Sequence, residues 1–219
     1  MESGQRYEPN LPQPMHFWVK SNREIPSICI IIRKMAKIII VRHGQTLDNE
    51  EKVFSGFRDV GLDEAGIKEA QNLAEKLKNE QISKAYSSDQ IRSKQTLEII
   101  LKYHPNVPVV ADPRIKERDY GDLTGTSKII AREKTPDLYK LWHRSYDVEP
   151  PRGESLKMVE TRVLSFLHDI LPNLKPDDVV LISAHGNSIR PMRRYFEHLS
   201  IDQMCTYEYA SGEIFEYQI

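Results

Sequence analysis

The chain has 219 residues, with 31 Lys and Arg against 32 Asp and Glu, so its formal net charge is −1. That length suits one α/β domain or two small ones, and the charge balance argues against a sequence-independent nucleic-acid binder, which needs a basic excess. Two cysteines, Cys29 and Cys205, make no disulfide framework and lie in no metal-binding spacing. No apolar run reaches the roughly 18 residues that span a membrane. We therefore expect a soluble, cytoplasmic protein.

Residues 1–34 differ from the rest of the chain. They carry four of the 13 prolines, show neither helical nor strand periodicity, and lack the pattern of a signal peptide. Met35 resembles a natural start and is followed at once by a strand-like run. We expect residues 1–34 to be a disordered N-terminal extension and residues 35–219 to form a single domain. An ordered strand at Ile28–Ile32 is the alternative.

From residue 37 onward, apolar β-branched runs alternate with amphipathic stretches. Strands are expected at residues 38–41, 84–87, 107–110 and 178–183. Helices are expected at residues 64–79, 89–103, 155–171 and 187–198, with short helices in 127–144 broken at Pro136. Residues 112–126 are expected to be loop, and Thr206–Tyr209 with Glu213–Tyr217 to form a hairpin. The alternation predicts a three-layer α/β/α sandwich around a mostly parallel central sheet.

Basic residues follow the predicted strands at the end where open α/β sheets bind ligands. Arg42 and His43 follow the first strand, Arg92 lies in the first helical turn after the second, and His185 follows the last. Helix N-termini attract anions through their free N–H groups and positive dipole end. On a chain with negative net charge, this cationic edge predicts a phosphate site.

Each of the two histidines is followed by a glycine, Gly44 and Gly186. A residue without a side chain would let a backbone N–H approach a ligand closely. The histidines lie far apart in sequence and belong to no HExxH motif or Cys/His cluster, so no metal is implied.

Metal-free phosphoryl transfer needs a nucleophile, positive charge on the phosphate oxygens and an acid for the leaving oxygen. Neutral His43 is suited to be the nucleophile, and Arg42 and Arg92 can each hold two oxygens. Glu117, in a loop with no other evident purpose, is the candidate that gives a proton and then takes it back.

Seven motifs occur in order along the chain: RHGQTLDN, FSGFRDVGLDEAG, SSDQIRSKQT, KERDYGDLTG, WHRSYD, RGESL and SAHGNSIR. From Lys37 to about Tyr217 the sequence resembles the histidine phosphatase superfamily, and within it the cofactor-dependent phosphoglycerate mutases. The resemblance implies a mutase domain in residues 35–219 that interconverts 3- and 2-phosphoglycerate in glycolysis and gluconeogenesis. It implies a phospho-His43 intermediate and a priming cofactor, 2,3-bisphosphoglycerate, without a metal.

The resemblance also implies roles for individual residues. Arg42, Arg92 and His185 would hold the transferring phosphate, and Glu117 would be the general acid and base. The residues implied to line the phosphate and substrate pocket are Asn49, Ser55, Gly56, Gly186 and Asn187. Those implied to bind the substrate's carboxylate and distal phosphate are Arg118, Tyr120, Lys128 and Arg144. The expected partner is a small phosphorylated carboxylate, not nucleic acid or a membrane; a homo-oligomer is left open.

Three departures from the mutase pattern keep a second function open. His143 precedes Arg144 where the family usually has two arginines, the insertion before Glu154 is reduced to residues 147–153, and the chain stops at Ile219 without a mobile tail. Less protection from water favours a phosphatase of small phosphorylated metabolites. A third reading, a binding module without activity, is disfavoured because binding alone requires no acid.

Overall fold

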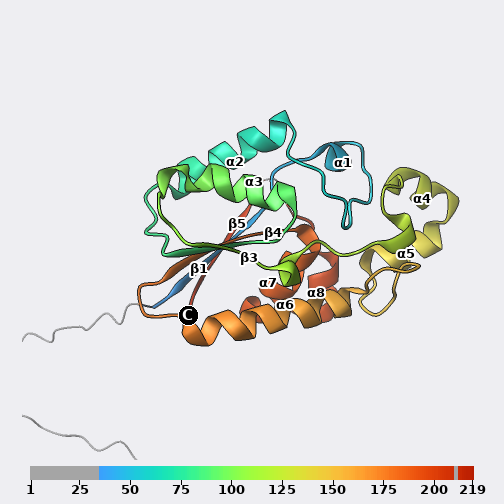
Figure 1. Ribbon diagram of the computed structural model, residues 1–219. Coiled ribbons are helices and arrows are strands. Elements are labelled where there is room, and N and C mark those ends of the chain that lie inside the picture. The colour runs from blue at the N-terminus through green and yellow to red at the C-terminus, as the bar shows by residue number, and fades with distance from the viewer. Residues whose placement is uncertain (1–34, 210–211) are drawn as a thin grey trace, which may run out of the picture. The chain divides into compact units, whose positions relative to one another are not determined.

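The computed structural model describes residues 35–209 and 212–219; the expectations for residues 1–34, including a strand at Ile28–Ile32, lie outside this range. The described chain is a three-layer sandwich with one five-stranded sheet of order β3-β2-β4-β1-β5 (Figure 1). Its strands are β1 (Lys37–Arg42), β2 (Lys84–Ser87), β3 (Val109–Ala111), β4 (Val179–Ala184) and β5 (Ile214–Gln218). All pairings are parallel except that of β5 with β1. The predicted fold class is confirmed.

The α-helices of the described chain are α1 (Leu47–Glu50), α2 (Glu64–Leu77), α3 (Ile91–Ile100), α4 (Lys128–Lys134), α5 (Pro136–Arg144), α6 (Leu156–Ile170), α7 (Gly186–Glu197) and α8 (Ile201–Thr206). Six of these eight helices fall where the amphipathic stretches predict them; α1 and α8 were not predicted. Asp63 caps α2 by accepting a hydrogen bond from the Gly66 N–H. Pro136 separates α4 from α5, as predicted, because proline suits the first turn of a helix and not its interior.

The central strand β1 is covered on both faces. Ile38 and Ile40 pack with side chains of α6 and α7, whereas Ile39 and Val41 pack with side chains of α2 and α3. Side chains alternate between the two faces of a strand, so a strand buried on both faces must be apolar at every position. Figure 1 shows the two helix pairs on opposite sides of the sheet.

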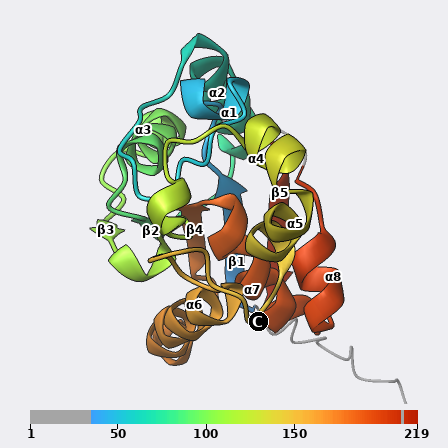
Figure 2. The same cartoon turned by 90° about the vertical axis from the view of Figure 1, so that its right-hand side faces the viewer.

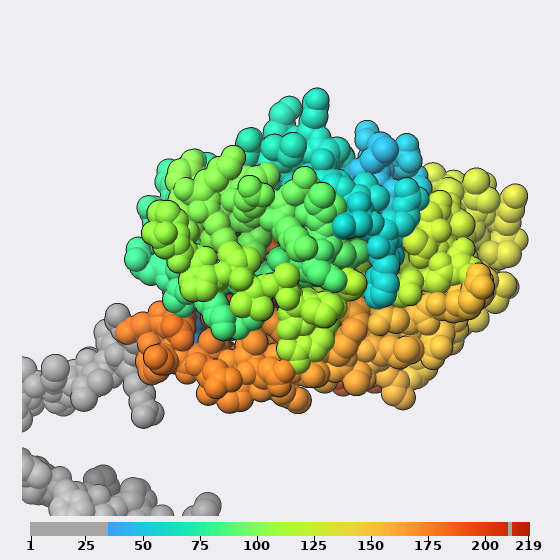
Figure 3. All heavy atoms as spheres, viewed as in Figure 1, coloured from blue at the N-terminus to red at the C-terminus, as the bar shows by residue number. Residues whose placement is uncertain are grey.

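The helices α1, α4 and α5 lie at the end of the sheet where the parallel strands finish, and Figure 2 looks onto this end. A bridge between Val53 and Ser127 joins the segment after α1 to the start of α4. In the space-filling view these two segments meet at the surface (Figure 3). The carboxyl ends of the strands are therefore enclosed by segments that are distant in sequence.

The predicted C-terminal hairpin is wrong. Of its first arm Thr206 ends α8, residues 207–209 belong to no helix or strand, and only Ile214–Gln218 joins the sheet, beside β1. Ser200 and Gln203 form a capping box that starts α8. Burial of Met204 and Cys205 against Leu156 then holds this short helix in place. Its six residues are too few to show a helical period in the sequence.

Candidate active site

The ends of β1 and β4 bring the two histidines together. These strands are neighbours with Arg42 opposite Ala184, and the His43 N–H donates to the Ala184 carbonyl at 3.0 Å. The rings of His43 and His185 follow directly, with centroids 4.9 Å apart. Because β1 and β4 are neighbours in the sheet, His43 and His185 lie side by side at the same edge, as predicted.

His43 is held as a neutral imidazole with one free nitrogen. Its side chain is buried, and Nδ1 lies 2.7 Å from the Gly44 carbonyl oxygen. A carbonyl can only accept, so Nδ1 carries the proton and Nε2 keeps its lone pair. Burial lowers the pKa of His43 well below its usual range, and the guanidinium groups of Arg92 and Arg42 lower it further. At neutral pH, Nε2 is thus available as a nucleophile.

His185 is fully buried and fixed by a serine. Its Nε2 lies 2.6 Å from the Ser88 hydroxyl, while Nδ1 has no hydrogen-bond partner in the described part of the chain. Burial lowers the pKa of His185 well below its usual range, with further contributions from Arg92 and His43. A buried polar nitrogen without a partner is costly in an unliganded protein. It marks a place where a ligand can bind.

Two arginines supply positive charge beside the histidines. Arg92 is almost fully buried and donates to the carbonyls of Arg58 at 2.7 Å and Gly56 at 3.1 Å, which fix its guanidinium. The Nε atoms of Arg92 and Arg42 are buried and have no hydrogen-bond partner among the described residues. Both N–H groups suit the oxygens of a bound phosphate.

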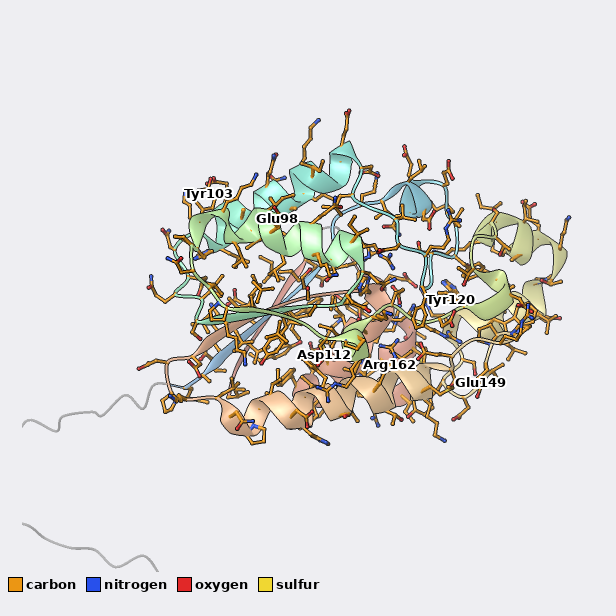
Figure 4. The ribbon with its side chains drawn as sticks, in the orientation of Figure 1. Glu98, Tyr103, Asp112, Tyr120, Glu149 and Arg162 are labelled. Carbon is orange, nitrogen blue, oxygen red and sulfur yellow. The ribbon has the colours of Figure 1, made fainter. Side chains whose placement is uncertain are left out.

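Glu117 is held in place by its backbone. Its N–H donates to Gln90 at 2.9 Å, and its carbonyl accepts from Arg162 of α6 at 2.8 Å. The carboxylate accepts from the Arg118 N–H at 2.7 Å and from the Asn187 N–H at 3.2 Å. Figure 4 shows Arg162 between α6 and the loop that carries Glu117. The predicted acid is thus positioned at the N-terminus of α7, beside His185.

Of these groups His43, Arg42, Arg92 and Glu117 line one cavity of about 390 Å³, and His185 lies buried directly behind His43. Its charged walls comprise six cations against two carboxylates, Glu117 and Glu208; the cations are Arg42, Lys52, Arg92, Lys128, Arg144 and Arg190. The background is acidic, because residues 1–34 hold five Lys and Arg and three Asp and Glu, which leaves 26 against 29 in residues 35–219. A cationic cavity in an acidic domain concentrates a ligand with several negative charges.

A model of the histidine phosphatase superfamily (branch 1) matches residues 38–218, and this range contains the complete cavity. The chain belongs to this superfamily.

Curated relatives of the chain include enzymes named as mutases. It is 41% identical over 181 residues to a 2,3-bisphosphoglycerate-dependent phosphoglycerate mutase of Nitrobacter winogradskyi, covering 80% of this chain and 87% of the relative. It is 39% identical over 181 residues to a phosphoglycerate mutase of Schizosaccharomyces pombe, covering 80% of this chain and 86% of the relative.

Solved structures share the fold at lower identity. One titled mycobacterial hydrolase 1 is 23% identical with a TM-score of 0.76, covering 83% of this chain and 90% of that one. A mycobacterial glucosyl-3-phosphoglycerate phosphatase is 25% identical with a TM-score of 0.69, covering 77% and 82%. The likeness to the first of these structures concerns the fold alone.

The structure brings most predicted site residues of this histidine phosphatase to the cavity. Besides the charged groups already named, those that line it are Asn49, Ser55, Gly56, Tyr120, Gly186 and Asn187. The Tyr120 hydroxyl accepts from the Asn187 side chain at 3.1 Å, and Figure 4 shows Tyr120 near α5. Burial raises the pKa of Tyr120, so its hydroxyl stays protonated.

Two predicted site residues, His185 and Arg118, are fully buried and do not line the cavity. His185 still lies next to His43, whereas Arg118 is bound to backbone carbonyls. Its Nε donates to the Glu154 carbonyl at 2.5 Å and Nη2 to the Val148 carbonyl at 3.2 Å. In this geometry Arg118 holds the loop of residues 147–154 through Nε and Nη2, while its buried Nη1 has no hydrogen-bond partner among the described residues.

Arg190 lines the cavity without having been predicted. It lies on α7 one turn after Asn187 and donates through Nη1 to the carbonyls of Met204 and Cys205, at 2.7 and 3.1 Å. Its spacing of three from Asn187 on one helix face was a usable signal. Lys52 and Tyr209 also line the cavity. Nothing near them in the sequence indicated it, because separate loops carry them.

The two glycines after the histidines have different roles. The Gly44 N–H donates to the Thr96 hydroxyl at 3.1 Å, and a Cβ on Gly44 would overlap the Gly66 carbonyl of α2. Gly44 is therefore needed for close packing of backbones, and not for ligand approach as predicted. A Cβ on Gly186 would meet nothing closer than the Glu117 carboxylate at 3.9 Å. The packing around Gly186 would therefore accommodate a small side chain at this position of the cavity.

Within residues 35–209 and 212–219, no group of three or more His, Cys, Asp or Glu side chains is arranged to hold a metal ion. The same residues contain no helix of sufficient length and hydropathy to cross a membrane. A larger cavity of about 1120 Å³ lies near Met35, at the amino end of β1, with a mostly apolar lining that includes Phe196 and Leu199. Its lining does not include His43, His185 or Glu117.

Proposed function

We propose that the protein is a phosphoglycerate mutase that interconverts 3- and 2-phosphoglycerate through phospho-His43. The observation that carries the proposal is a second group of cations in the cavity, Lys128, Arg144 and Arg190, beside those at the histidines. A phosphoglycerate brings a carboxylate as well as a phosphate, whereas a simple phosphate ester has no use for the second group. The names of the relatives near 40% identity support the same activity.

The geometry supports transfer in two steps. In the first, His43 Nε2 forms a bond to phosphorus while the ester P–O bond breaks, and Glu117 gives its proton to the leaving oxygen. Arg42, Arg92 and His185 stabilise the charge on the three non-bridging oxygens. In the second, a substrate hydroxyl attacks phospho-His43, Glu117 takes up the hydroxyl proton, and the N–P bond breaks. With 2,3-bisphosphoglycerate as the donor, the first step phosphorylates His43 and releases a monophosphoglycerate. In the second step 3-phosphoglycerate accepts the phosphoryl group at its 2-hydroxyl and becomes 2,3-bisphosphoglycerate, and return of the 3-phosphoryl group to His43 leaves 2-phosphoglycerate.

The cofactor expected for such a mutase, 2,3-bisphosphoglycerate, fits the residues present. It would supply the phosphoryl group that first loads His43. Its two phosphates and one carboxylate match a cavity with six cationic side chains, and the unpartnered nitrogens of Arg42, Arg92 and His185 suit one of the phosphates. The reaction places the protein in glycolysis and gluconeogenesis, for which we propose a cytoplasmic location.

Hydrolysis is the second candidate, because water can replace the substrate hydroxyl in the second step. His143 favours it. This residue lines the cavity beside Arg144, and burial, together with Arg144 and Lys128, lowers its pKa to about 3. At neutral pH it carries no charge where mutases usually have an arginine, so the grip on a substrate carboxylate is weaker.

One assay separates the two candidates. The protein is given 3-phosphoglycerate with and without 2,3-bisphosphoglycerate, and 2-phosphoglycerate and free phosphate are followed together. A mutase forms 2-phosphoglycerate faster with the cofactor and releases little phosphate. Phosphate release without 2-phosphoglycerate would overturn the mutase proposal in favour of the phosphatase.

The nucleophile is tested separately by labelling. The wild-type protein is expected to become phosphorylated in an acid-labile, base-stable form, and His43→Ala is expected not to. His168→Ala, at an exposed histidine of α6, is the matched control and should label normally. Label that persists in His43→Ala would refute the assignment.

A further inference from the structure

One cation of the second group in the cavity, Arg144, already forms an ion pair with a carboxylate of the protein itself. We call this group, Lys128, Arg144 and Arg190, the distal cations. Arg144, the last residue of α5, donates through Nε and Nη2 to the same oxygen of Glu208, at 3.2 and 2.6 Å. Glu208 lies in the segment between α8 and β5, and both residues line the cavity. The bond that a ligand carboxylate would make to Arg144 is thus already made within the chain.

The two partners of this ion pair are held unequally. The Arg144 side chain is 24% exposed, and its Nη1 also donates to the His143 carbonyl at 3.1 Å. The Glu208 side chain is 74% exposed. Exposed pairs of this kind are weak because water and salt screen them. Glu208 can therefore swing into solvent at little cost while Arg144 stays anchored to its backbone carbonyl.

The charges around the pair make this exchange relevant to binding. His143 is neutral, and Arg190, another distal cation, already donates to the two carbonyls at the end of α8. Arg144 is then a principal cation available to an incoming carboxylate, and Glu208 neutralises it. A ligand carboxylate must displace Glu208 and is repelled by it until it does.

We propose that Glu208 is an internal competitor that sets the affinity of this cavity for carboxylate-bearing phosphate esters. The inference rests on the proposed function and deepens it. Glu208 weakens the binding of substrate and product alike. Very tight binding of the product would slow its release from the cavity, and Glu208 prevents this. A phosphate ester with an uncharged distal end leaves the Arg144–Glu208 pair closed and gains nothing from its removal.

The test is binding calorimetry on the full chain with two ligands. 3-Phosphoglycerate carries the carboxylate, and glycerol 3-phosphate has an alcohol in its place. Glu208→Gln is expected to bind 3-phosphoglycerate about two- to fivefold tighter, the range expected for losing one exposed ion pair, with a smaller change for glycerol 3-phosphate. Glu75→Gln, which breaks the surface pair with Lys78 on α2, is the matched control and should change neither affinity.

Two results would overturn the inference. Equal gains for both ligands would show a general charge effect, and weaker binding of 3-phosphoglycerate would show that Glu208 positions Arg144 productively. Because the measurement is of binding, a chain that binds 3-phosphoglycerate but forms no 2-phosphoglycerate contradicts the proposed function and still decides the role of Glu208. If neither wild type nor variant binds 3-phosphoglycerate, both proposals fail.

A double-mutant cycle identifies the partner. In an Arg144→Gln background, Glu208→Gln is expected to lose its selective effect on 3-phosphoglycerate, because the cation for which it competes is gone. A selective gain that persists without Arg144 would assign the competition to another cation and refute the proposed pair.

Discussion

Ser88 and His185, 97 residues apart in sequence, are joined by a hydrogen bond of 2.6 Å between Ser88 Oγ and His185 Nε2. The Gln90 N–H already donates to Ser88 Oγ at 3.2 Å, so the hydroxyl proton can be given to Nε2. His185 is then protonated at Nδ1, the nitrogen without a partner in the described residues. Donation from Ser88 Oγ to Nε2 would stabilise the tautomer that offers an N–H to a bound phosphate, and replacement of the serine tests this role.

Ser88→Ala is expected to lower kcat by about 2- to 12-fold, the effect of losing one neutral hydrogen bond, with a smaller change in KM. Without the serine, His185 can adopt the tautomer that offers a lone pair to an anionic phosphate. Steady-state kinetics measure the split between kcat and KM. Ser155→Ala removes a buried hydroxyl that accepts from the Met158 N–H at the start of α6 and controls for general damage. An unchanged kcat in Ser88→Ala would contradict the tautomer role.

Glu117→Gln is expected to slow turnover of phosphoglycerate by about 10²-fold or more, because an amide cannot protonate the leaving oxygen. The first step with p-nitrophenyl phosphate should be much less affected, because nitrophenolate leaves without a proton. Rapid-mix measurement of His43 phosphorylation with both donors gives the comparison. Near-normal rates with the poor leaving group would remove Glu117 from its role as acid.

His143 makes stability depend on pH. Its pKa is about 3 in the folded protein against an ordinary value of 6.5, so between these values the unfolded chain binds a proton that the folded chain does not. Stability is therefore full above pH 6.5 and is lost as the pH falls towards 3. When the pH falls from 6.5 to 5, the unfolding free energy of wild type is expected to drop by roughly 2 kcal/mol more than that of His143→Gln.

Urea unfolding at several pH values measures this difference, with His168→Gln as the matched control at an exposed histidine. The control should follow the wild-type curve. Parallel pH dependence of wild type and His143→Gln would show that His143 is not the titrating group.

Gly44→Ala is expected to destabilise the fold by about 1–3 kcal/mol or more, as overpacking does in a tight interior, because its Cβ would overlap the α2 backbone at Gly66. Gly186→Ala is the matched comparison, since its Cβ would make only ordinary contacts. Urea unfolding at pH 7 decides between them. Equal losses in both variants would mean that close approach of Gly44 to α2 is not what requires glycine.

The sequence predicted the parts of the site that local rules control. A buried strand followed by His-Gly, or a helix beginning near Arg92, fixes a position at the end of the sheet from a few neighbouring residues. The predictions for the residues that would bind the distal end of the substrate rested on the family resemblance. The structure places some of these residues at the cavity and others away from it. Lys128 and Arg144 line the cavity, while Arg118 is turned into the protein. Whether a loop arginine faces a cavity depends on carbonyls such as those of Val148 and Glu154, which no local pattern reveals.

The same limit applies to Arg190 and α8. The carbonyls that hold Arg190 belong to a helix of six residues, too short for periodicity to detect. The capping box of Ser200 and Gln203 was the available signal. The sequence pattern predicted no helix or strand for residues 201–205, and burial of Met204 holds them as a helix.

The adjacency of β1 and β4 also determines when the catalytic centre can first exist. Arg42 and Ala184, which face each other across these strands, are 142 residues apart in the chain. Pairing them closes a very long loop, and such contacts form slowly because the entropy of closure is lost before the contact stabilises anything. A ribosome releases the His43 strand long before the His185 strand. A nascent chain, or one clipped before β4, therefore holds only one of the two histidines of the proposed active site, and we expect turnover only from chains in which β1 and β4 have paired.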